Sequence, residues 1–301
     1  MLLQSGIDAA RRAGTRRGEV VAMNCAALVY SMRGDSWAAL AGSIDAFFAA
    51  RNENDRLGMA TAMPMLAGSL LLLTPVESEI GMLRAALKIA DEAAMHFGAA
   101  HQYAIVVPSQ FGNWRVLVNM ANFSRKRAKV ARARQATQES EQHLTAGIKT
   151  SERVESHCRE QQRLLILVDA LSISGLLLTQ HGHHQEAHKE LNEAWNLARE
   201  HKLRATLPLL GLELGRIDVI NGNIQRAEIT IALALREAAL YRPSPKAAAL
   251  CELMADIRQS RGDEVGMRHW HNDATGATRD FDALKEQVRA EIAKVTRSLQ
   301  A

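Results

Sequence analysis

Aromatic residues, proline and cysteine are all scarce in this chain, and each scarcity excludes a class of protein. Aromatic residues make up 4% of the 301 positions, and the chain has six prolines and three cysteines. Cys25, Cys158 and Cys251 are far apart and form no CxxC pair. Neither a disulfide framework nor a thiolate metal site is therefore expected, and a reducing compartment fits best. Runs of alternating Val, Ile and Thr between hairpin turns are nearly absent, which argues against a β-sheet protein.

A strong excess of one charge and the usual signatures of catalysis are missing as well. The chain carries 37 Lys and Arg against 33 Asp and Glu, a formal net charge of +4. That near-balance gives no overall attraction to nucleic acid or to a membrane. The sequence contains no phosphate loop, dinucleotide glycine pattern, nucleophile elbow or paired-acid motif. We therefore predict no catalytic residue, no cofactor and no enzymatic activity.

One uncharged stretch is long enough to span a bilayer. It runs from Leu57 to Val76. Pro64, Gly68 and Ser69 interrupt it, and amphipathic helices of soluble type flank it on both sides. A buried helix is therefore favoured over a transmembrane span. The N-terminus has no basic region followed by an apolar core, so no signal peptide is expected and the prediction is a cytoplasmic protein.

Helix-forming residues and a repeat are what the chain does have. Ala, Leu, Glu, Arg and Gln dominate, and they lose little rotamer freedom in a helix. The tripeptides HGH, NGN and RGD place glycines at 182, 222 and 262, so a spacing of 40 occurs twice. A glycine allows the positive φ with which many helices end. The pattern predicts an all-α fold built from helices joined by tight turns.

Small and large residues recur at fixed offsets from these three glycines. Two antiparallel helices approach closely only where small residues face each other, and a large apolar residue then fills the groove between them. Seven residues before each glycine stand Gly175, Gly215 and Ala255. Five residues after stand Ala187, Ala227 and Met267, nine after stand Leu191, Ile231 and His271, and twelve after stand Ala194, Ala234 and Ala274.

These offsets resemble the tetratricopeptide repeat (TPR) family. Its pattern has a small residue at repeat position 8, glycine at 15, alanine at 20, a large apolar residue at 24 and alanine at 27. The period here is 40 instead of about 34, as in long-period arrays of bacterial signalling and regulatory proteins. Asp218 and Arg258 depart from the family, because they occupy a place usually given to a bulky apolar residue. Met267 and His271 show that the third repeat is degraded.

The match is looser in the N-terminal half. Residues at positions 8, 11, 15 and 20 of a fourth repeat are Ala27, Tyr30, Gly34 and Ala39. Helices are predicted near 56–73 and 77–96, and Pro108 and Gly112 predict a break. Pro245 suits the first turn of a later helix, with Ser244 as its N-cap.

The resemblance implies one α-solenoid of six or seven antiparallel hairpins, a right-handed superhelix over residues 1–301. The clearest repeats are expected in 165–280 and degenerate ones in 1–160. A final amphipathic helix over 280–299 is expected to cap the last repeat. A coiled-coil seam on that helix, through which the protein would self-associate, remains the alternative. Its apolar stripe is Phe281, Leu284, Val288, Ile292, Val295 and Leu299.

Four histidines, His181, His183, His184 and His188, lie within eight residues around Gly182. The spacing of His184 and His188 is that of two metal ligands on one helix. Zinc needs three or four ligands, and no Cys, Asp or Glu at motif spacing completes the set here. Packing at the turn is therefore favoured over a metal site.

The segment 125–134 is strongly basic, with Arg125, Lys126, Arg127, Lys129, Arg132 and Arg134. Such a cluster can bind phosphates in a salt-dependent way. No DNA-binding or base-stacking motif accompanies it. A solvated helix face complemented by the downstream Glu139 and Glu141 is the favoured alternative.

The resemblance also implies a binding surface. A TPR solenoid presents a concave groove lined by the first helix of each hairpin, and such grooves bind peptides or helices. The family's groove positions are 2, 5, 9 and 12. The Lys and Asn carboxylate clamp of chaperone-binding members is missing, so a free C-terminal carboxylate is not the expected ligand. In this chain the groove positions hold Asp169, Ser172, Leu176, Thr179, Leu209, Leu212, Arg216, Val219, Ala249, Glu252, Asp256 and Gln259.

The predicted function is that of a regulatory or adaptor module which binds a peptide or helix of another protein in this groove. The lining grades from apolar to acidic, which suits an amphipathic or basic segment. Two alternatives stay open. One is a transcription-related regulator that contacts nucleic acid through residues 125–134. The other is the TPR sensor region of a signalling protein that lacks its output domain.

Overall fold

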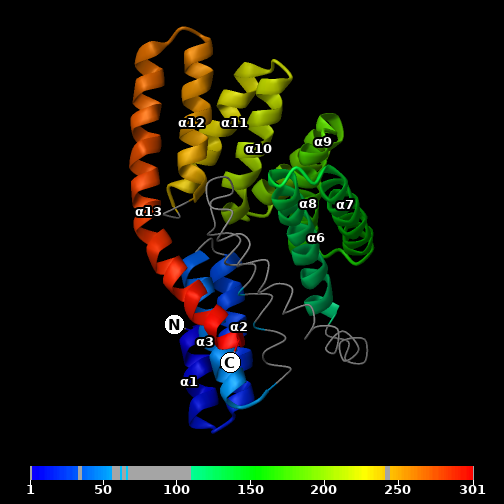
Figure 1. Ribbon diagram of the computed structural model, residues 1–301, viewed down its shortest axis with the longest axis vertical. Helices are drawn as coiled ribbons and strands as arrows, with labels where there is room; N and C mark the ends of the chain where they lie inside the picture. Colours follow the sequence, from blue (N-terminus) through cyan, green and yellow to red (C-terminus); the bar gives the residue numbers. More distant parts are fainter. Residues whose placement is uncertain are drawn as a thin grey trace. The chain divides into compact units, whose positions relative to one another are not determined.

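The computed structural model of the protein describes residues 2–32, 36–55, 62, 66, 110–240 and 245–300. These residues form helices and the turns between them, and no strand occurs among them. The all-α prediction is confirmed. The elements are α1 (Leu2–Arg12), α2 (Arg16–Met32), α3 (Ser36–Asn52), α6 (Gln110–Ala133), α7 (Thr137–Glu160), α8 (Leu164–His181), α9 (His184–Glu200), the 3-10 turn η1 (Arg204–Thr206), α10 (Leu207–Ile220), α11 (Ile224–Ala238), α12 (Pro245–Ser260) and α13 (Glu264–Gln300) (Figure 1).

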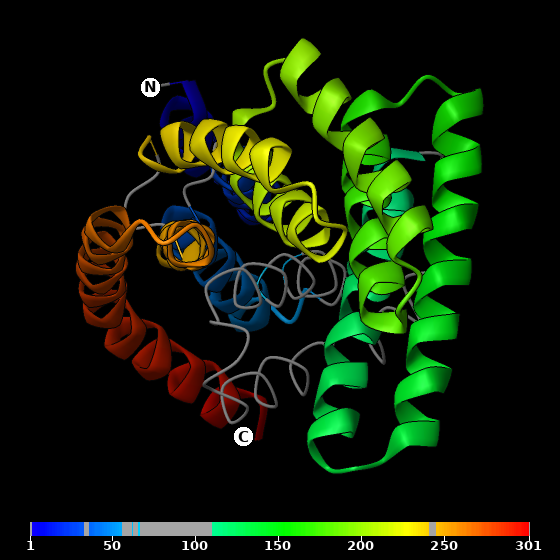
Figure 2. The same cartoon turned by 90° about the horizontal axis from the view of Figure 1, so that it is seen from above.

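The chain divides into two compact units. One comprises residues 1–119 and 287–301, and the other comprises residues 120–286. The second unit contains the repeat with the 40-residue spacing. It is an α-solenoid of helical hairpins in tandem, in which α8 pairs with α9 and α10 with α11. Figure 2 shows the same helices from above, turned by 90° from the view of Figure 1.

The three turn glycines have the predicted conformation. Gly182, Gly222 and Gly262 have φ angles of 92°, 75° and 73°, all in the left-handed region. After each glycine, the next amide donates to a carbonyl five residues earlier, with N···O distances of 2.9, 2.7 and 3.0 Å. This hydrogen bond satisfies a carbonyl that the helix end would leave without a partner. The register that the glycines predict is therefore confirmed.

Four further turns use the same geometry without glycine. Asn54, Gln135, Gln162 and Lys202 have φ angles of 53°, 61°, 53° and 57°. The amide after each of them also donates to a carbonyl five residues earlier. A left-handed conformation costs a non-glycine residue roughly 1–2 kcal/mol. Because these residues carry no glycine signal, the sequence pattern does not reveal these turns.

The predicted pairing of small and large residues inside each hairpin is confirmed for the first two repeats. A Cβ on Gly175 would lie 2.4 Å from Cγ of Leu191, and a Cβ on Gly215 would lie 2.7 Å from Cγ1 of Ile231. Backbones this close tolerate no side chain at the glycine. In the third hairpin Ala255 is buried but His271 is exposed, as expected of a degraded repeat.

Successive hairpins are joined by the same device. A Cβ on Gly211 in α10 would lie 2.4 Å from Cβ of Ala234 in α11 and 3.2 Å from the Trp195 ring in α9. Trp195 is buried, with 6% of its surface exposed. The absence of a side chain at Gly211 therefore lets one large aromatic ring connect two hairpins.

α8 is the core helix of the second unit. Most of its side chains between Ile166 and Leu177 are buried, whatever face of the helix they lie on. Among the described residues, α8 is also the one helix long and apolar enough to cross a membrane, and 61% of its 18 residues are buried in the protein. One buried helix of this kind is weak evidence for a membrane span. The uncharged stretch Leu57–Val76 lies outside the described residues, apart from Ala62 and Leu66, which are buried.

The C-terminal helix corrects one prediction. The final helix does not begin at 280, because α13 runs without interruption from Glu264 to Gln300. The second helix of the third hairpin and the predicted capping helix are therefore one element. Gly276 lies in the middle of α13 without a positive φ, and no proline follows Pro245 to end the helix. The start of α12 at Pro245 is as predicted.

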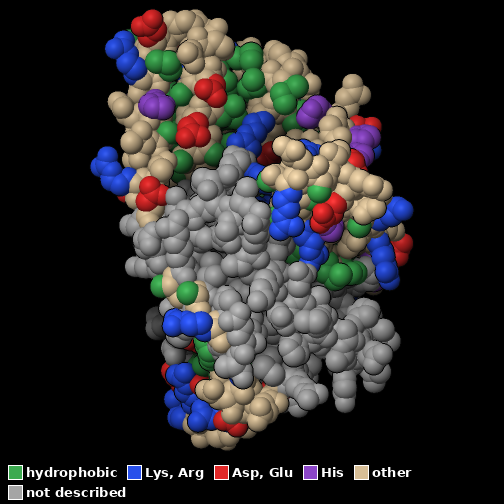
Figure 3. Space-filling model, in the orientation of Figure 1, with side chains coloured by type: hydrophobic (Ala, Val, Ile, Leu, Met, Phe, Trp, Pro, Cys, Tyr) green, Lys and Arg blue, Asp and Glu red, His purple; other side chains and the backbone are tan. Residues whose placement is uncertain are grey.

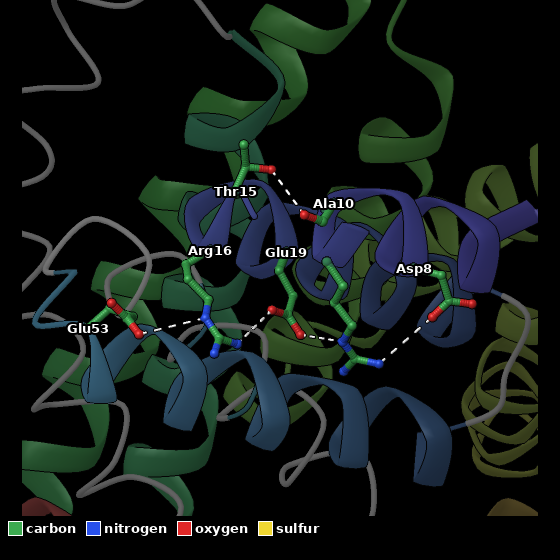
Figure 4. Close-up of polar contacts among 7 residues, drawn as sticks. Asp8, Ala10, Thr15, Arg16, Glu19 and Glu53 are labelled. Carbon is green, nitrogen blue, oxygen red and sulfur yellow. Dashed lines mark hydrogen bonds and ion pairs between the residues drawn. The ribbon is translucent and has the colours of Figure 1, made fainter. Parts of the chain in front are cut away.

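The first unit contains α1, α2 and α3, and α2 packs on α3. Glu19 of α2 is 4% exposed and binds two arginines. Arg11 Nε lies 2.6 Å from Glu19 Oε1, and Arg16 Nη1 lies 3.2 Å from Oε2 (Figure 4). The hydrogen bond from Arg11 is the main cause that lowers the pKa of this carboxyl. Ala27 and Ala39 are buried. Outside the described residues lie Gly34, Pro108, the segment 77–96 and, apart from Ala62 and Leu66, the segment 56–73.

Candidate functional site

The predicted groove positions lie on α8, α10 and α12, and their exposure changes from helix to helix. On α8, Ser172 and Leu176 are buried, with 5% and 3% of their surfaces exposed. The Ser172 hydroxyl donates to the Val168 carbonyl at 2.6 Å, so it offers no free donor. Thr179 is half-buried and donates to the Gly175 carbonyl at 2.8 Å. Asp169 is also half-buried. The α8 part of the predicted groove is therefore largely closed to a ligand.

The α10 part of the predicted groove is half-buried. Arg216 and Val219 are half-buried. Nη1 of Arg216 lies 3.1 Å from Oε1 of Glu213, three residues earlier on the same helix. This pair neutralises Arg216 locally. The surface that α10 offers is therefore mixed, with one apolar and one neutralised polar side chain.

The α12 part is open. Glu252, Asp256 and Gln259 are all exposed. They follow one another at spacings of four and three residues, which places them on one face of the helix. No described residue forms an ion pair with Glu252 or Asp256. In the view of Figure 3, hydrophobic, acidic, basic and histidine side chains lie intermixed at the upper left, where Figure 1 shows α12 and the first part of α13. The open part of the predicted groove is thus acidic.

The basic segment on α6 does not form one exposed patch. Arg125 and Lys126 are buried, with 9% and 2% of their surfaces exposed. Arg125 donates to Oδ1 of Asn122 at 3.2 Å. Arg132 is exposed and donates to the Gln180 carbonyl of α8 at 3.0 Å. Arg127 and Lys129 are half-buried, and Arg134 is exposed.

The two acidic residues predicted to balance this basic segment have other partners in the structure. Glu139 lies 3.6 Å from Nε2 of His143, and Glu141 lies 2.7 Å from Nε2 of His181. The two acids that were expected to balance the basic segment instead face histidines. The basic side chains of α6 therefore hold helices together in part, which a periodicity argument from the sequence could not show.

The four clustered histidines do not converge on one point. His181 binds Glu141, and its ring stacks on that of His183 with centroids 4.7 Å apart. His188 Nε2 lies 3.4 Å from Oδ1 of Asp218 on the next hairpin. His184 opens α9 and is half-buried. Among the described residues, no group of three or more His, Cys, Asp or Glu has the geometry of a metal site.

The two departures from the TPR pattern belong to ion pairs. Asp218 is 1% exposed, and Arg226 binds both of its oxygens, with Nε 2.8 Å from Oδ2. Arg226 also lies within 2.8 Å of the His188 ring nitrogen. Arg258 lies 3.2 Å from Glu228. A buried carboxylate with two-point binding by arginine satisfies its charge, which explains how Asp218 replaces a bulky apolar residue.

A rule links these contacts. Glu141, His188 and Glu228 each lie six residues after the left-handed turn residue of their hairpin. Each of the three binds a residue on the first helix of the next hairpin, and these partners are His181, Asp218 and Arg258. We call these three contacts the inter-hairpin pairs. The sequence signal for them was available as unusual polar residues at a packed position, but their partners depend on the hairpin stacking.

A second group of charges joins α7 to α9. Arg159 binds Glu193 with two hydrogen bonds of 2.6 and 2.9 Å. One turn earlier on the same two helices, Glu155 of α7 and Glu190 of α9 lie near each other and near the Ser174 hydroxyl of α8. Burial, followed by the charge of Glu190, raises the pKa of Glu155 to about 8. Burial also raises the pKa of Glu190. Nothing in the sequence pattern singles out this pair, because α7 and α9 are separated by α8.

Comparisons with known proteins leave the family open. No protein-family model matches the sequence, and no curated protein matches it either. Among solved structures, a circular tandem repeat protein with novel repeat topology and enhanced subunit contact surfaces matches with 15% sequence identity. The match covers 97% of this chain and 79% of that chain, with a TM-score of 0.32. A likeness at this level carries no information about function.

Proposed function

We propose that this protein is a TPR-like interaction module that binds a segment of another protein. The support comes from the tandem hairpins with their 40-residue period and from the position of the open surface on α12. Solenoids of this type act through extended surfaces that successive hairpins build together. In this proposal the protein is a cytoplasmic, non-enzymatic regulator or adaptor.

The observation that carries the proposal is the pair Glu252 and Asp256. Like charges four residues apart on a helix are unfavourable by about 0.2–0.5 kcal/mol. Both side chains are exposed, and no described residue pairs with them. A basic segment in the groove would neutralise both carboxylates, and half-buried Val219 of α10 offers it an apolar contact. The proposed ligand is therefore an amphipathic segment with Lys or Arg on one face.

Nucleic acid is not proposed as the ligand. Binding to phosphates needs a cluster of accessible cations. Two of the six basic residues in segment 125–134, Arg125 and Lys126, are buried, and Arg132 donates to the backbone of α8. Of the other three, Arg127 and Lys129 are half-buried and Arg134 is exposed, so the segment does not offer a cluster of fully accessible cations.

The experiment is capture of the partner by the intact protein, followed by an affinity measurement with the purified pair. The test variant is Glu252→Lys with Asp256→Lys. The control is Glu186→Lys with Glu200→Lys, which makes the same change of charge at exposed positions of α9. The double variant on α12 is expected to bind at least about tenfold more weakly, whereas the control keeps its affinity within about twofold. Equal affinities for all three proteins would refute the groove assignment.

A further inference from the structure

Two pairs of side chains join α7 and α9, one with opposite charges and one with two acidic groups. Arg159 and Glu193 form a neutral ion pair with two hydrogen bonds. Glu155 and Glu190 lie one helical turn before Arg159 and Glu193 on the same faces of α7 and α9, so this second link brings two acidic groups together. Glu155 is 9% exposed, and its Oε1 atom has no hydrogen-bond partner among the described residues. The Oε2 atom of Glu190 is likewise buried without a partner.

Two ionised carboxylates in such a site would repel each other strongly, because little water is present to screen them. One proton removes this repulsion and also creates a donor, so that one carboxyl can hydrogen-bond to the other. We infer that Glu155 and Glu190 form a proton-gated joint: one shared proton holds α7 against α9, and loss of that proton loosens the contact. The joint would respond to pH without any other ligand.

The neighbouring charges leave the pair without a cation of its own. Arg159 is the nearest cation on α7, and it is engaged by Glu193. Lys189 on α9 is exposed, and its charge opposes the rise in the pKa of Glu190. From α8 the pair receives the Ser174 hydroxyl, which favours the ionised form of Glu155. Cys158, next along α7, is buried, and burial raises the pKa of its thiol, so it brings no negative charge near neutral pH.

The pH window follows from the direction of the shift. An ordinary Glu has a pKa of 4.5, and the pKa of Glu155 is raised to about 8. Between these values the folded protein keeps a proton that the unfolded chain has lost. The contribution of the pair to stability is therefore complete below pH 4.5 and is lost as pH rises through 8. The joint loosens at the alkaline edge of the physiological range.

The joint lies between successive hairpins. α7 is joined to α6 by the turn at Gln135, and α8 to α9 by the turn at Gly182. α7 and α9 are thus the second helices of two neighbouring hairpins, and their side chains link these hairpins directly. A change there alters the curvature of a solenoid, because each hairpin is placed by its neighbours alone.

The test is thermal unfolding of the full-length protein between pH 5 and 9. The variants are Glu155→Gln and Glu190→Gln, with Glu152→Gln as a control that removes one exposed carboxylate from α7. The difference in Tm between Glu155→Gln and the wild type is expected to be near zero at pH 5. It is expected to grow to at least about 3 °C in favour of the variant by pH 8 and then to level off.

The Glu190→Gln variant is expected to reproduce this profile, and the variant with both substitutions should add little, since one neutral group already removes the repulsion. The control should follow the wild type. A parallel ¹³C NMR titration is expected to show a Glu carboxyl that titrates near pH 8 and is absent from Glu155→Gln. A difference in Tm that does not change with pH, or the absence of such a carboxyl, would overturn the proposal.

Discussion

At the scale of single residues, the hairpins depend on glycines that are defined by what lies beside them. Gly175 and Gly276 are both helical, yet their surroundings differ. A Cβ on Gly175 would lie 2.4 Å from Leu191 Cγ, whereas a Cβ on Gly276 would meet nothing within 4 Å. The first glycine is required by packing, and the second only weakens its helix.

We therefore predict opposite results for the same substitution. Gly175→Ala is expected to lower the free energy of unfolding by about 1–3 kcal/mol, because the added methyl group displaces Leu191. Gly276→Ala is expected to raise it by up to about 1 kcal/mol, through higher helix propensity. Urea denaturation of both variants measures the difference. A loss of stability in both, or in neither, would contradict the close approach at Gly175.

At the scale of helices and turns, one hydrogen-bonded turn recurs with different residues. Gly222 and Gln162 have φ angles of 75° and 53°, and the turns around them have the same backbone hydrogen bond. Gln162→Gly is expected to stabilise the protein by about 0.5–1 kcal/mol. A glycine has no Cβ atom, so it adopts the left-handed backbone conformation without the steric cost that glutamine bears. Gly222→Ala should destabilise it by roughly 1–2 kcal/mol.

A rescue variant completes the test of the turns. Asparagine tolerates the left-handed region better than alanine does. Gly222→Asn is therefore expected to be more stable than Gly222→Ala by thermal unfolding. If alanine and asparagine were equivalent, or if Gln162→Gly destabilised the protein, the left-handed turn would not be the cause.

The inter-hairpin pairs are the second feature at this scale. Glu228 lies 3.2 Å from Arg258 and 2.7 Å from Arg261 on the next hairpin. Glu228→Arg and Arg258→Glu each place like charges opposite each other, so each is expected to cost roughly 1 kcal/mol. The variant with both changes restores the Glu–Arg contact and should recover at least half of the summed loss. Strictly additive losses would show that the two residues do not interact.

The sequence predicts those parts of the fold whose geometry requires a particular type of residue. The three glycines 40 residues apart and their small neighbours were visible, because a left-handed turn and a close helix approach each demand glycine or alanine. The turns at Gln135, Gln162 and Lys202 left no such trace, since a hydrogen-bonded turn can impose a left-handed φ on any residue at a cost. The continuous α13 was missed for a similar reason: only a proline or a capping residue marks a helix end.

The repeat numbering predicts which residues of the candidate site share a helix face, but it does not predict which of them are exposed. The repeat numbering placed Glu252, Asp256 and Gln259 on one helix face, and the structure shows them exposed. The same numbering gave no warning that Ser172 and Leu176 are buried. The pair of Glu155 and Glu190 was also hidden, because residues on α7 and α9 meet only through the stacking of hairpins. Contacts between helices that are not consecutive leave little signal in one sequence.

At the scale of the whole molecule, the proposal concerns one of the two units. The repeat unit, residues 120–286, contains the turn glycines, the inter-hairpin pairs and the open α12 surface. The central claim is that the exposed face of α12 binds a segment of a partner protein. This claim is separate from the proton-gated joint, which is tested by stability alone.

The most direct measurement is site-specific photocrosslinking in the intact protein. A photoreactive amino acid replaces Gln259 on α12 in one variant and Glu186 on α9 in the other, both at exposed positions. The account predicts one dominant crosslinked protein from position 259, with the attachment point in a basic amphipathic segment, and little or none from position 186. Equal crosslinking from both positions, or attachment to an acidic segment, would contradict it.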